Sequence, residues 1–319
     1  MRRAGLVSAL ALTLVTVVPS AQQPAPSGTA DLVGTWTLEF TELPGAGQPT
    51  RVPNPRGLLI FDSAGHVFET VTRATRQQPA GAEPRLTDQQ LAFAMYSGYW
   101  GRYKADPVKK TFTYQAEGAF SPNVQGRSFT RSVQFTRDRL VVTAADGEPH
   151  IAAGTKWTWE RVPPVDGRGP TYRRVVGFWQ HVVEKRMNLT TGATMSETRR
   201  APSIIVYTPS GYVGVHFPPL NREPFAGASP TEAEARAAMR GYVGYFGALA
   251  VYPNMVFHQV LNGISPAAGQ TLRRPLELNA DGSEVTIKFP PGTNQQGHQT
   301  STWVTLKRLS GEEAMLPKR

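Results

Sequence analysis

The sequence contains no cysteine. This absence excludes disulfide bonds, thiolate metal sites, a cysteine nucleophile and a lipid anchor attached to cysteine. Charged residues are also scarce, at 18% of the chain, and this value disfavours a coiled coil or a disordered acidic protein. The fold must therefore be held together by packing without covalent cross-links.

Several functional motifs are absent as well. No Gly-rich phosphate loop or Gly-x-Ser-x-Gly turn occurs, and the net charge of +10 includes no run of five basic residues. We therefore expect a solvated basic surface, no nucleic-acid partner and no cofactor. A metal site built from three strands is conceivable but is supported by no His-x-x-x-His spacing, so no metal is expected from the four histidines of the second half: His181, His216, His258 and His298.

Long apolar runs are missing except near the N-terminus. Arg2 and Arg3 precede the apolar segment Leu6–Val18, which is too short to span a bilayer. Residues 1–21 are predicted to be a signal peptide, with an uncleaved anchor as the alternative, and residues 22–31 a disordered tether. The mature protein is then expected to have no integral membrane span and to be periplasmic or secreted, in a bacterium.

An internal repeat is the main feature that is present. Leu32–Trp36 returns as Val175–Trp179, and Tyr96–Gly101 returns as Tyr242–Gly247. The separation of matched segments stays between 143 and 146 residues. Two domains of one fold are therefore predicted. Their expected bounds are 32–162 and 173–309, with a Pro- and Gly-rich linker at 163–172 and a tail at 310–319.

Each half shows about eight strand patterns and one helix. The 30 glycines and 27 prolines favour short strands with many turns. Residues 57–72 are typical of a hairpin. Thr87 with Gln90, and Ser229 with Glu232, have the spacing that starts a helix. Eight antiparallel strands can close a barrel around one small ligand, so an all-β fold of two tandem antiparallel β-barrels, with one short helix per repeat, is predicted.

Each half also resembles the lipocalin-like domain family of bacterial proteins, which is related to the calycin barrels. The resemblance includes a Gly-x-Trp opening (Gly34 and Trp36; Gly177 and Trp179), a Tyr-x-Gly-Tyr segment and a Ser-Pro-x-x-x-Gly turn. It implies two tandem lipocalin-like barrels. It further implies that each first-strand Trp packs under a basic residue of the last strand, Trp36 under Arg161 and Trp179 under Arg308, as a cation–π contact. The resemblance leaves the activity open.

Strand alternation points to one buried arginine in each half. Arg131 falls among the apolar residues of 129–135 and Arg274 among those of 272–278, so both are predicted to face inward. A buried guanidinium keeps its proton and needs an anionic or hydrogen-bonding partner. Both halves keep this arginine, so a structural role, paired with a carboxylate or backbone carbonyls, is the alternative to ligand binding.

The two halves differ in the strand that precedes each arginine. It places Tyr114 inward in the first half and His258 inward at the matching position of the second. An arginine beside His258 favours the neutral imidazole, which can bind a carboxylate or carbonyl or act as a base. His258 and Tyr114 are therefore the candidate catalytic residues. The full set of candidate ligand-binding residues is His258, Arg274, Tyr245, Arg131, Tyr114 and Tyr99.

Three functions are compatible with these patterns. The leading prediction is an exported lipocalin-like protein that binds a small hydrophobic or amphipathic ligand, partly apolar with an anionic or carbonyl end, in the second barrel near His258 and Arg274. The first alternative is a cofactor-free isomerase or cyclase in which His258 or Tyr114 transfers a proton. The second alternative is an interaction module whose barrels are filled solid.

Overall fold

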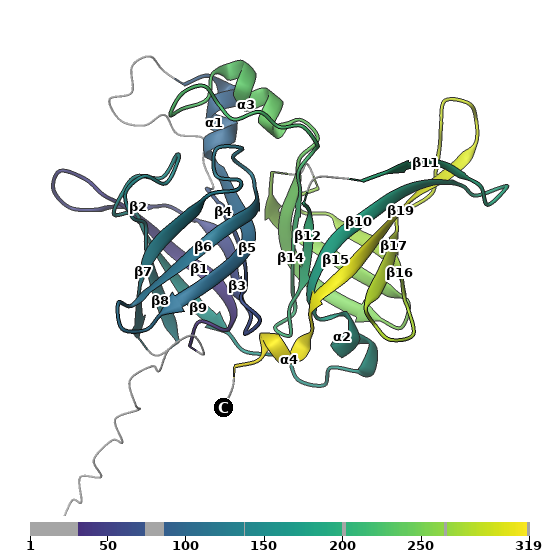
Figure 1. Ribbon diagram of the computed structural model, residues 1–319, viewed down its shortest axis with the longest axis horizontal. Coiled ribbons are helices and arrows are strands. Elements are labelled where there is room, and N and C mark those ends of the chain that lie inside the picture. Colours follow the sequence, from purple (N-terminus) through teal and green to yellow (C-terminus); the bar gives the residue numbers. More distant parts are fainter. Residues whose placement is uncertain (1–30, 74–85, 137, 200–201, 265–266, 318–319) are drawn as a thin grey trace, which may run out of the picture.

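The computed structural model describes residues 31–73, 86–136, 138–199, 202–264 and 267–317. Two β-barrels lie side by side, the first at the left and the second at the right of Figure 1. The predicted signal peptide, and the predicted tether apart from Asp31, lie outside the described residues.

The first barrel is a closed antiparallel sheet. Its strand order is β2-β1-β3-β4-β5-β6-β7-β8-β9, and pairing of β1 with β9 closes the circle. Helix α1 stands between β4 and β5. The elements are β1 (Gly34–Leu43), β2 (Thr50–Val52), β3 (Arg56–Phe61), β4 (His66–Thr72), α1 (Asp88–Ala94), β5 (Tyr96–Asp106), β6 (Thr111–Ala119), β7 (Ser128–Thr136), β8 (Arg139–Thr143) and β9 (Lys156–Val162).

The second barrel repeats this order and is closed by β10 and β19. The prediction of two tandem all-β barrels is confirmed, and the described residues contain two short helices, α2 and α4, in addition to one per repeat. The elements are α2 (Pro170–Val175), β10 (Gly177–Asn188), β11 (Thr194–Thr198), β12 (Ile204–Tyr207), β13 (Tyr212–Phe217), α3 (Glu232–Met239), β14 (Val243–Tyr252), β15 (Met255–Gly263), β16 (Thr271–Leu278), β17 (Glu284–Lys288), β18 (Gly292–Thr293), β19 (Gln299–Ser310) and α4 (Glu312–Met315).

The same contact closes both barrels. The Arg161 guanidinium carbon lies 4.0 Å from the centre of the Trp36 ring, and that of Arg308 lies 4.1 Å from the centre of the Trp179 ring. Each arginine also donates to a backbone carbonyl just before the Gly-x-Trp motif. The expectation drawn from the family resemblance is thus confirmed, and these four side chains join the first strand to the last.

The glycine of each Gly-x-Trp motif has a backbone conformation that other residues rarely adopt. Its φ is +140° at Gly34 and +139° at Gly177. A Cβ at Gly177 would lie 2.0 Å from the Ser310 carbonyl oxygen, whereas at Gly34 it would meet only the flexible end of Arg161, at 2.8 Å.

We therefore expect Gly177→Ala to lower the free energy of unfolding by about 2 to 3 kcal/mol, and Gly34→Ala by about 1 kcal/mol. Both variants strain the backbone, but only Gly177→Ala also collides with a main-chain atom. Urea unfolding of both proteins tests this order. Equal losses would show that the Ser310 carbonyl can move aside.

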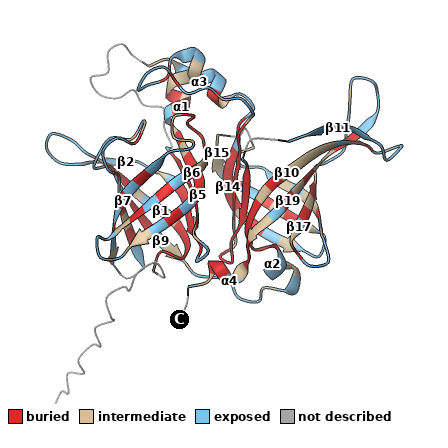
Figure 2. Cartoon of the chain, in the orientation of Figure 1, coloured by how far each residue is buried: buried red, intermediate tan, exposed pale blue. Residues whose placement is uncertain are grey.

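A third apolar layer lies between the two barrels. Strand β3 is buried on both faces, because Leu59 and Phe61 point into the first barrel while Leu58 and Ile60 contact the second. The facing strands are accordingly buried in Figure 2. The layer between the barrels, called the inter-barrel layer below, contains Leu58, Ile60, Phe68, Trp100, Val176, Phe178, Ile204, Val206, Phe246 and Met315.

The predicted start of one helix needs correction. Helix α1 has the expected capping box of Thr87 with Gln90. The cap of α3, however, is Thr231, because its hydroxyl and the Glu234 carboxylate form the reciprocal pair of bonds two residues after the predicted Ser229. The predicted linker runs into α2, and the predicted tail folds back as α4, where Met315 is buried in the inter-barrel layer.

Candidate ligand cavity

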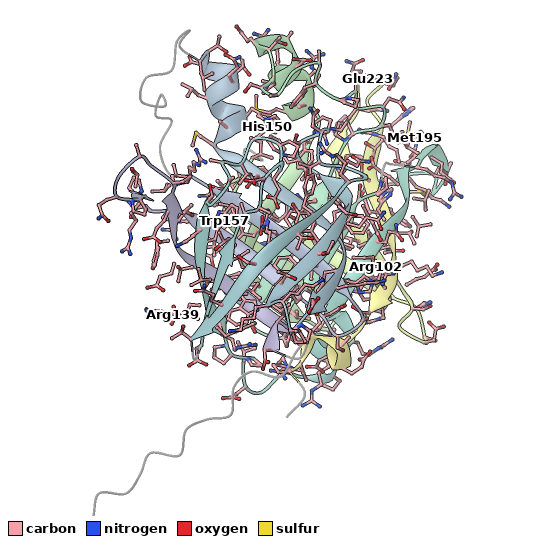
Figure 3. The ribbon with its side chains drawn as sticks, turned by 60° about the vertical axis from the view of Figure 1, so that its left-hand side comes forward. Arg102, Arg139, His150, Trp157, Met195 and Glu223 are labelled. Atoms are coloured by element: carbon pink, nitrogen blue, oxygen red, sulfur yellow. The ribbon has the colours of Figure 1, made fainter. Side chains whose placement is uncertain are left out.

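A cavity of about 290 Å³ occupies the α1 end of the first barrel. Its wall includes residues of α1 and β4 to β7, together with Ser229 and Pro230 of the second domain. Gln90 on α1 donates to the Pro230 carbonyl at 2.8 Å, which holds this part of the second domain over the mouth. Figure 3 shows His150 nearer α1 and Trp157 further along the barrel. Both residues line the cavity.

A buried ion cluster forms the closed end of this cavity. Arg131 is fully buried and binds Glu148 through two parallel bonds of 2.8 and 3.0 Å. It also donates to Glu69 at 2.6 Å. Longer contacts, at 3.5 and 3.4 Å, reach the hydroxyl oxygens of Tyr99 and Tyr114. All five side chains line the cavity, and they are called the Arg131 cluster below.

The cluster uses every donor that it contains. The guanidinium has five N–H groups, and the five contacts of Arg131 account for all of them. The Tyr114 hydroxyl donates to Glu148 at 3.3 Å, and the Tyr99 hydroxyl is hydrogen-bonded to Glu69. When both carboxylates are ionised, the cluster can therefore accept further hydrogen bonds through its oxygen atoms but has no N–H or O–H group left to donate.

Burial shifts the pKa values of the cluster. Desolvation raises the pKa of Glu69, and the Arg131 charge opposes this shift only in part. Burial works to lower the pKa of Arg131, but the carboxylates of Glu148 and Glu69 raise it well above its ordinary value. The guanidinium therefore stays charged, while Glu69 holds its proton to a higher pH than a free glutamate.

The remaining cavity wall is largely apolar or aromatic. Phe93 stacks on Phe120 with ring centres 4.8 Å apart, and the Arg131 guanidinium lies 4.6 Å from the Trp157 ring centre. At the mouth, burial lowers the pKa of His150. The cavity thus joins an aromatic wall to one ionic end, as small-molecule sites commonly do.

Two members of this cluster were predicted from the sequence. The inward orientations of Arg131 and Tyr114 are confirmed, and their side chains meet. Glu69 was missed, although it has the same strand parity as the inward Val67 and Val71, so alternation was a usable signal. Glu148 lies in the loop between β8 and β9, where no periodicity applies, and no sequence signal places it.

The matching position of the second barrel is built differently. His258 is buried, and its two ring nitrogens contact the hydroxyls of Tyr207 at 3.1 Å and Tyr245 at 2.8 Å. Desolvation and the charge of Arg274 lower the pKa of His258 to about 3. This direction agrees with the predicted neutral imidazole beside an arginine. A neutral ring has one donor and one acceptor nitrogen, so one tyrosine donates to it and the other accepts.

Arg274 is half-buried on the inward face of β16. Its guanidinium lies 4.3 Å from the Phe289 ring centre and donates to the Arg273 carbonyl at 3.0 Å. Within the described ranges no ion pair joins Arg274 to a carboxylate. It lines neither the first cavity nor a second one of about 220 Å³ near Leu32 and Phe135. Ligand binding by His258, Arg274 and Tyr245 stays a prediction.

The second domain also supports the site of the first. His216 on β13 points out of its own barrel and donates from Nε2 to the Glu69 carbonyl at 3.0 Å. Its Nδ1 accepts from the Tyr242 hydroxyl at 2.8 Å. Burial lowers the pKa of His216 to about 4, so the ring is neutral. The second barrel thereby holds the main chain of the strand that carries Glu69.

In the part of the chain that the structure describes, no three His, Asp or Glu side chains converge as metal ligands. His216 and His258 lie on opposite faces of their barrel wall, one outward and one inward. No helix among the described residues is long and apolar enough to cross a membrane.

Comparison with protein families identifies the fold. A family model described as a lipocalin-like domain matches the chain twice, over residues 33–162 and 176–309. The chain belongs to the lipocalin-like domain family. A comparison with curated proteins gave no match. Closed eight-stranded antiparallel barrels can hold one small ligand, so membership of this family suggests a small-ligand binding domain.

Proposed function

We propose that the cavity of the first barrel binds a small, partly apolar molecule. The observation that carries this proposal is the cavity itself, because it joins an aromatic wall to a buried polar cluster at its closed end. A filled-barrel interaction module has no use for such a space in the first barrel. The basic and apolar N-terminal pattern supports a further proposal, that the protein acts in the periplasm or outside the cell.

The proposed location differs from the leading prediction made from sequence. That prediction placed an anionic or carbonyl-ended ligand beside His258 and Arg274. The described cavity instead lies against Arg131, whose N–H groups are already bound to protein oxygens. The first barrel is therefore the better supported site, and an anionic end is not favoured there.

Filling the cavity tests the proposal. Ser97 lines the cavity, and its counterpart in the second repeat is the exposed Val243. We expect Ser97→Phe to weaken binding of the fluorescent probe N-phenylnaphthylamine at least about tenfold, because the ring occupies the ligand space. The matched control Val243→Phe should leave the affinity within about twofold of the wild type.

Fluorescence titration of the three proteins measures these affinities. Circular dichroism and urea unfolding check that each variant is folded. Equal affinities in all three folded proteins, or no probe binding to the wild type, would contradict a ligand site in the first barrel.

A second function, a cofactor-free isomerase or cyclase, is favoured by one observation. Glu69 lines the cavity and its pKa is raised, which suits a carboxyl group that donates a proton to a bound molecule. Native mass spectrometry of a co-purifying ligand, followed by incubation of the free ligand with the protein, distinguishes the two functions. An isomer of unchanged mass would indicate turnover, and recovery of the same compound would indicate binding.

A further inference from the structure

The charges of the Arg131 cluster do not balance when both of its glutamates are ionised. Arg131 contributes one positive charge, and Glu69 and Glu148 contribute two negative charges. All three side chains are almost fully buried, so water screens this imbalance poorly. An uncompensated buried charge is costly, and it must be removed by a proton or by another cation.

The other cation along the cavity wall lies too far away to balance this charge. Arg73 also lines the cavity, but it is exposed and stands at the mouth, where its backbone N–H donates to the carbonyl of Met95, the last residue before β5. It follows Glu69 by four residues, about 13 Å along an extended chain. Burial lowers the pKa of Arg73, and the described ion pairs of Glu69 and Glu148 are with Arg131 and not with Arg73. The closed end therefore keeps its excess of negative charge.

We infer that the closed end of the first barrel's cavity selects a ligand that carries a primary or secondary ammonium group on an apolar body. This inference rests on the proposed function, because it assigns the ligand class of the same cavity. The ammonium group supplies the donors and the positive charge that the ionised cluster lacks. A carboxylate-ended ligand would add a third negative charge and find no free donor on Arg131.

The cavity wall agrees with this ligand class. Tyr99 and Tyr114 stack face to face at the closed end, with ring centres 3.9 Å apart. Phe93, Tyr96 and Phe120 line the space nearer the mouth. Aromatic faces attract ammonium groups as well as apolar chains, so the same wall suits both ends of an amphipathic amine.

The second repeat shows that the excess charge is not required by the fold. Val215 occupies the position of Glu69, four residues after the matching turn glycine, and it is buried in the second core. Arg274 takes the place of Arg131 without a carboxylate partner among the described residues. The first barrel thus pairs its inward arginine with two carboxylates, and the second barrel has neither pairing among the described residues. This difference between two barrels of one family points to a functional role for the carboxylates in the first barrel.

Ligand and proton compete for the same carboxylate. In the empty cavity, burial favours the protonated form of Glu69. The groups that face it are Arg131 from β7, Glu148 from the β8–β9 loop, Tyr99 from β5 and Tyr114 from β6, while neutral His216 binds its backbone carbonyl. An ammonium group that docks against Glu69 displaces the proton, so amine affinity falls as the pH is lowered through the pKa of Glu69.

Three probes of one size test the inference on the wild-type protein. Phenylbutylamine, phenylbutanol and phenylbutyrate share an apolar body and end in an ammonium, a hydroxyl and a carboxylate. By calorimetry we expect the amine to bind roughly tenfold more tightly than the alcohol, and the carboxylate to bind most weakly. Titration in two buffers of different ionisation enthalpy should show proton release with the amine and none with the alcohol.

The outcomes separate the inference from the proposed function. Any other order of affinities overturns the inference, as does failure of the amine to bind a protein that still binds N-phenylnaphthylamine. Failure of all four compounds to bind overturns the proposed function itself.

The variant Glu69→Gln adds a second test. Because Arg131 keeps its paired bonds to Glu148, we expect this variant to fold. Its amine affinity should fall roughly tenfold, its alcohol affinity should stay within about twofold, and its proton release should disappear. Glu117→Gln, on the surface beside Arg102, is the matched control and should behave as the wild type. An unchanged amine preference in folded Glu69→Gln overturns the inference.

Discussion

The variant Arg131→Met is expected to lose about 3 to 5 kcal/mol of unfolding free energy. Methionine has a similar length but no charge, so Glu69 and Glu148 remain buried without their shared cation. Removing one member of a buried ion cluster leaves the full desolvation penalty of the others. Urea unfolding followed by tryptophan fluorescence measures the loss, and it should be larger at neutral pH than at a pH low enough to protonate Glu69.

The internal repeat supplies the control for this variant. Arg274→Met changes the matching residue of the second barrel, where the described residues provide no carboxylate partner, and it should cost about 1 kcal/mol or less. Adding Glu69→Val, the residue type found at this position in the second repeat, should restore part of the stability of Arg131→Met. Similar losses for Arg131→Met and Arg274→Met would show that the cluster is not the main reason for the cost.

The variant Phe178→Ala is expected to lose about 3 to 5 kcal/mol and to weaken the coupling between the barrels. Phe178 is fully buried in the inter-barrel layer, and its ring stacks on His66 of the first barrel with centres 5.2 Å apart. Scanning calorimetry should show one unfolding transition for the wild type. The variant should show a broadened transition, or two, because each barrel keeps its own core.

Thr35 is the counterpart of Phe178 in the first repeat and provides the matched control. Thr35→Ala should cost about 1 kcal/mol or less, since it removes only a small buried side chain. A single sharp transition in Phe178→Ala, with a loss no larger than that of Thr35→Ala, would contradict the role given to the inter-barrel layer.

The repeat and strand alternation were sufficient to predict the barrels and the inward side chains. Period-two alternation depends only on local backbone geometry, so Arg131, Tyr114 and His258 could be placed without knowledge of the whole chain. Alternation also places Glu69 inward, on the face of Val67 and Val71, although Glu69 was not among the predicted site residues. Glu148 could not be found because loop conformation is set by tertiary contacts.

The inter-barrel layer was the other feature that sequence reasoning missed. The run Leu58–Phe61 is apolar at every position, a pattern typical of a strand covered on both faces, but it was interpreted as one half of an ordinary hairpin. The partner that covers the second face is more than a hundred residues away in sequence. The same distance hides the contact of His216 with Glu69, since no local pattern connects the two strands.

The bond from His216 to the Glu69 carbonyl has an evolutionary consequence. After a gene duplication, each copy is ordinarily free to accumulate changes while the other preserves the original role. Here a side chain of the second repeat, His216, holds the strand of the first repeat that carries the cavity-lining Glu69. We therefore expect the two repeats to be retained together, because exchanging either half for a foreign barrel would remove this contact.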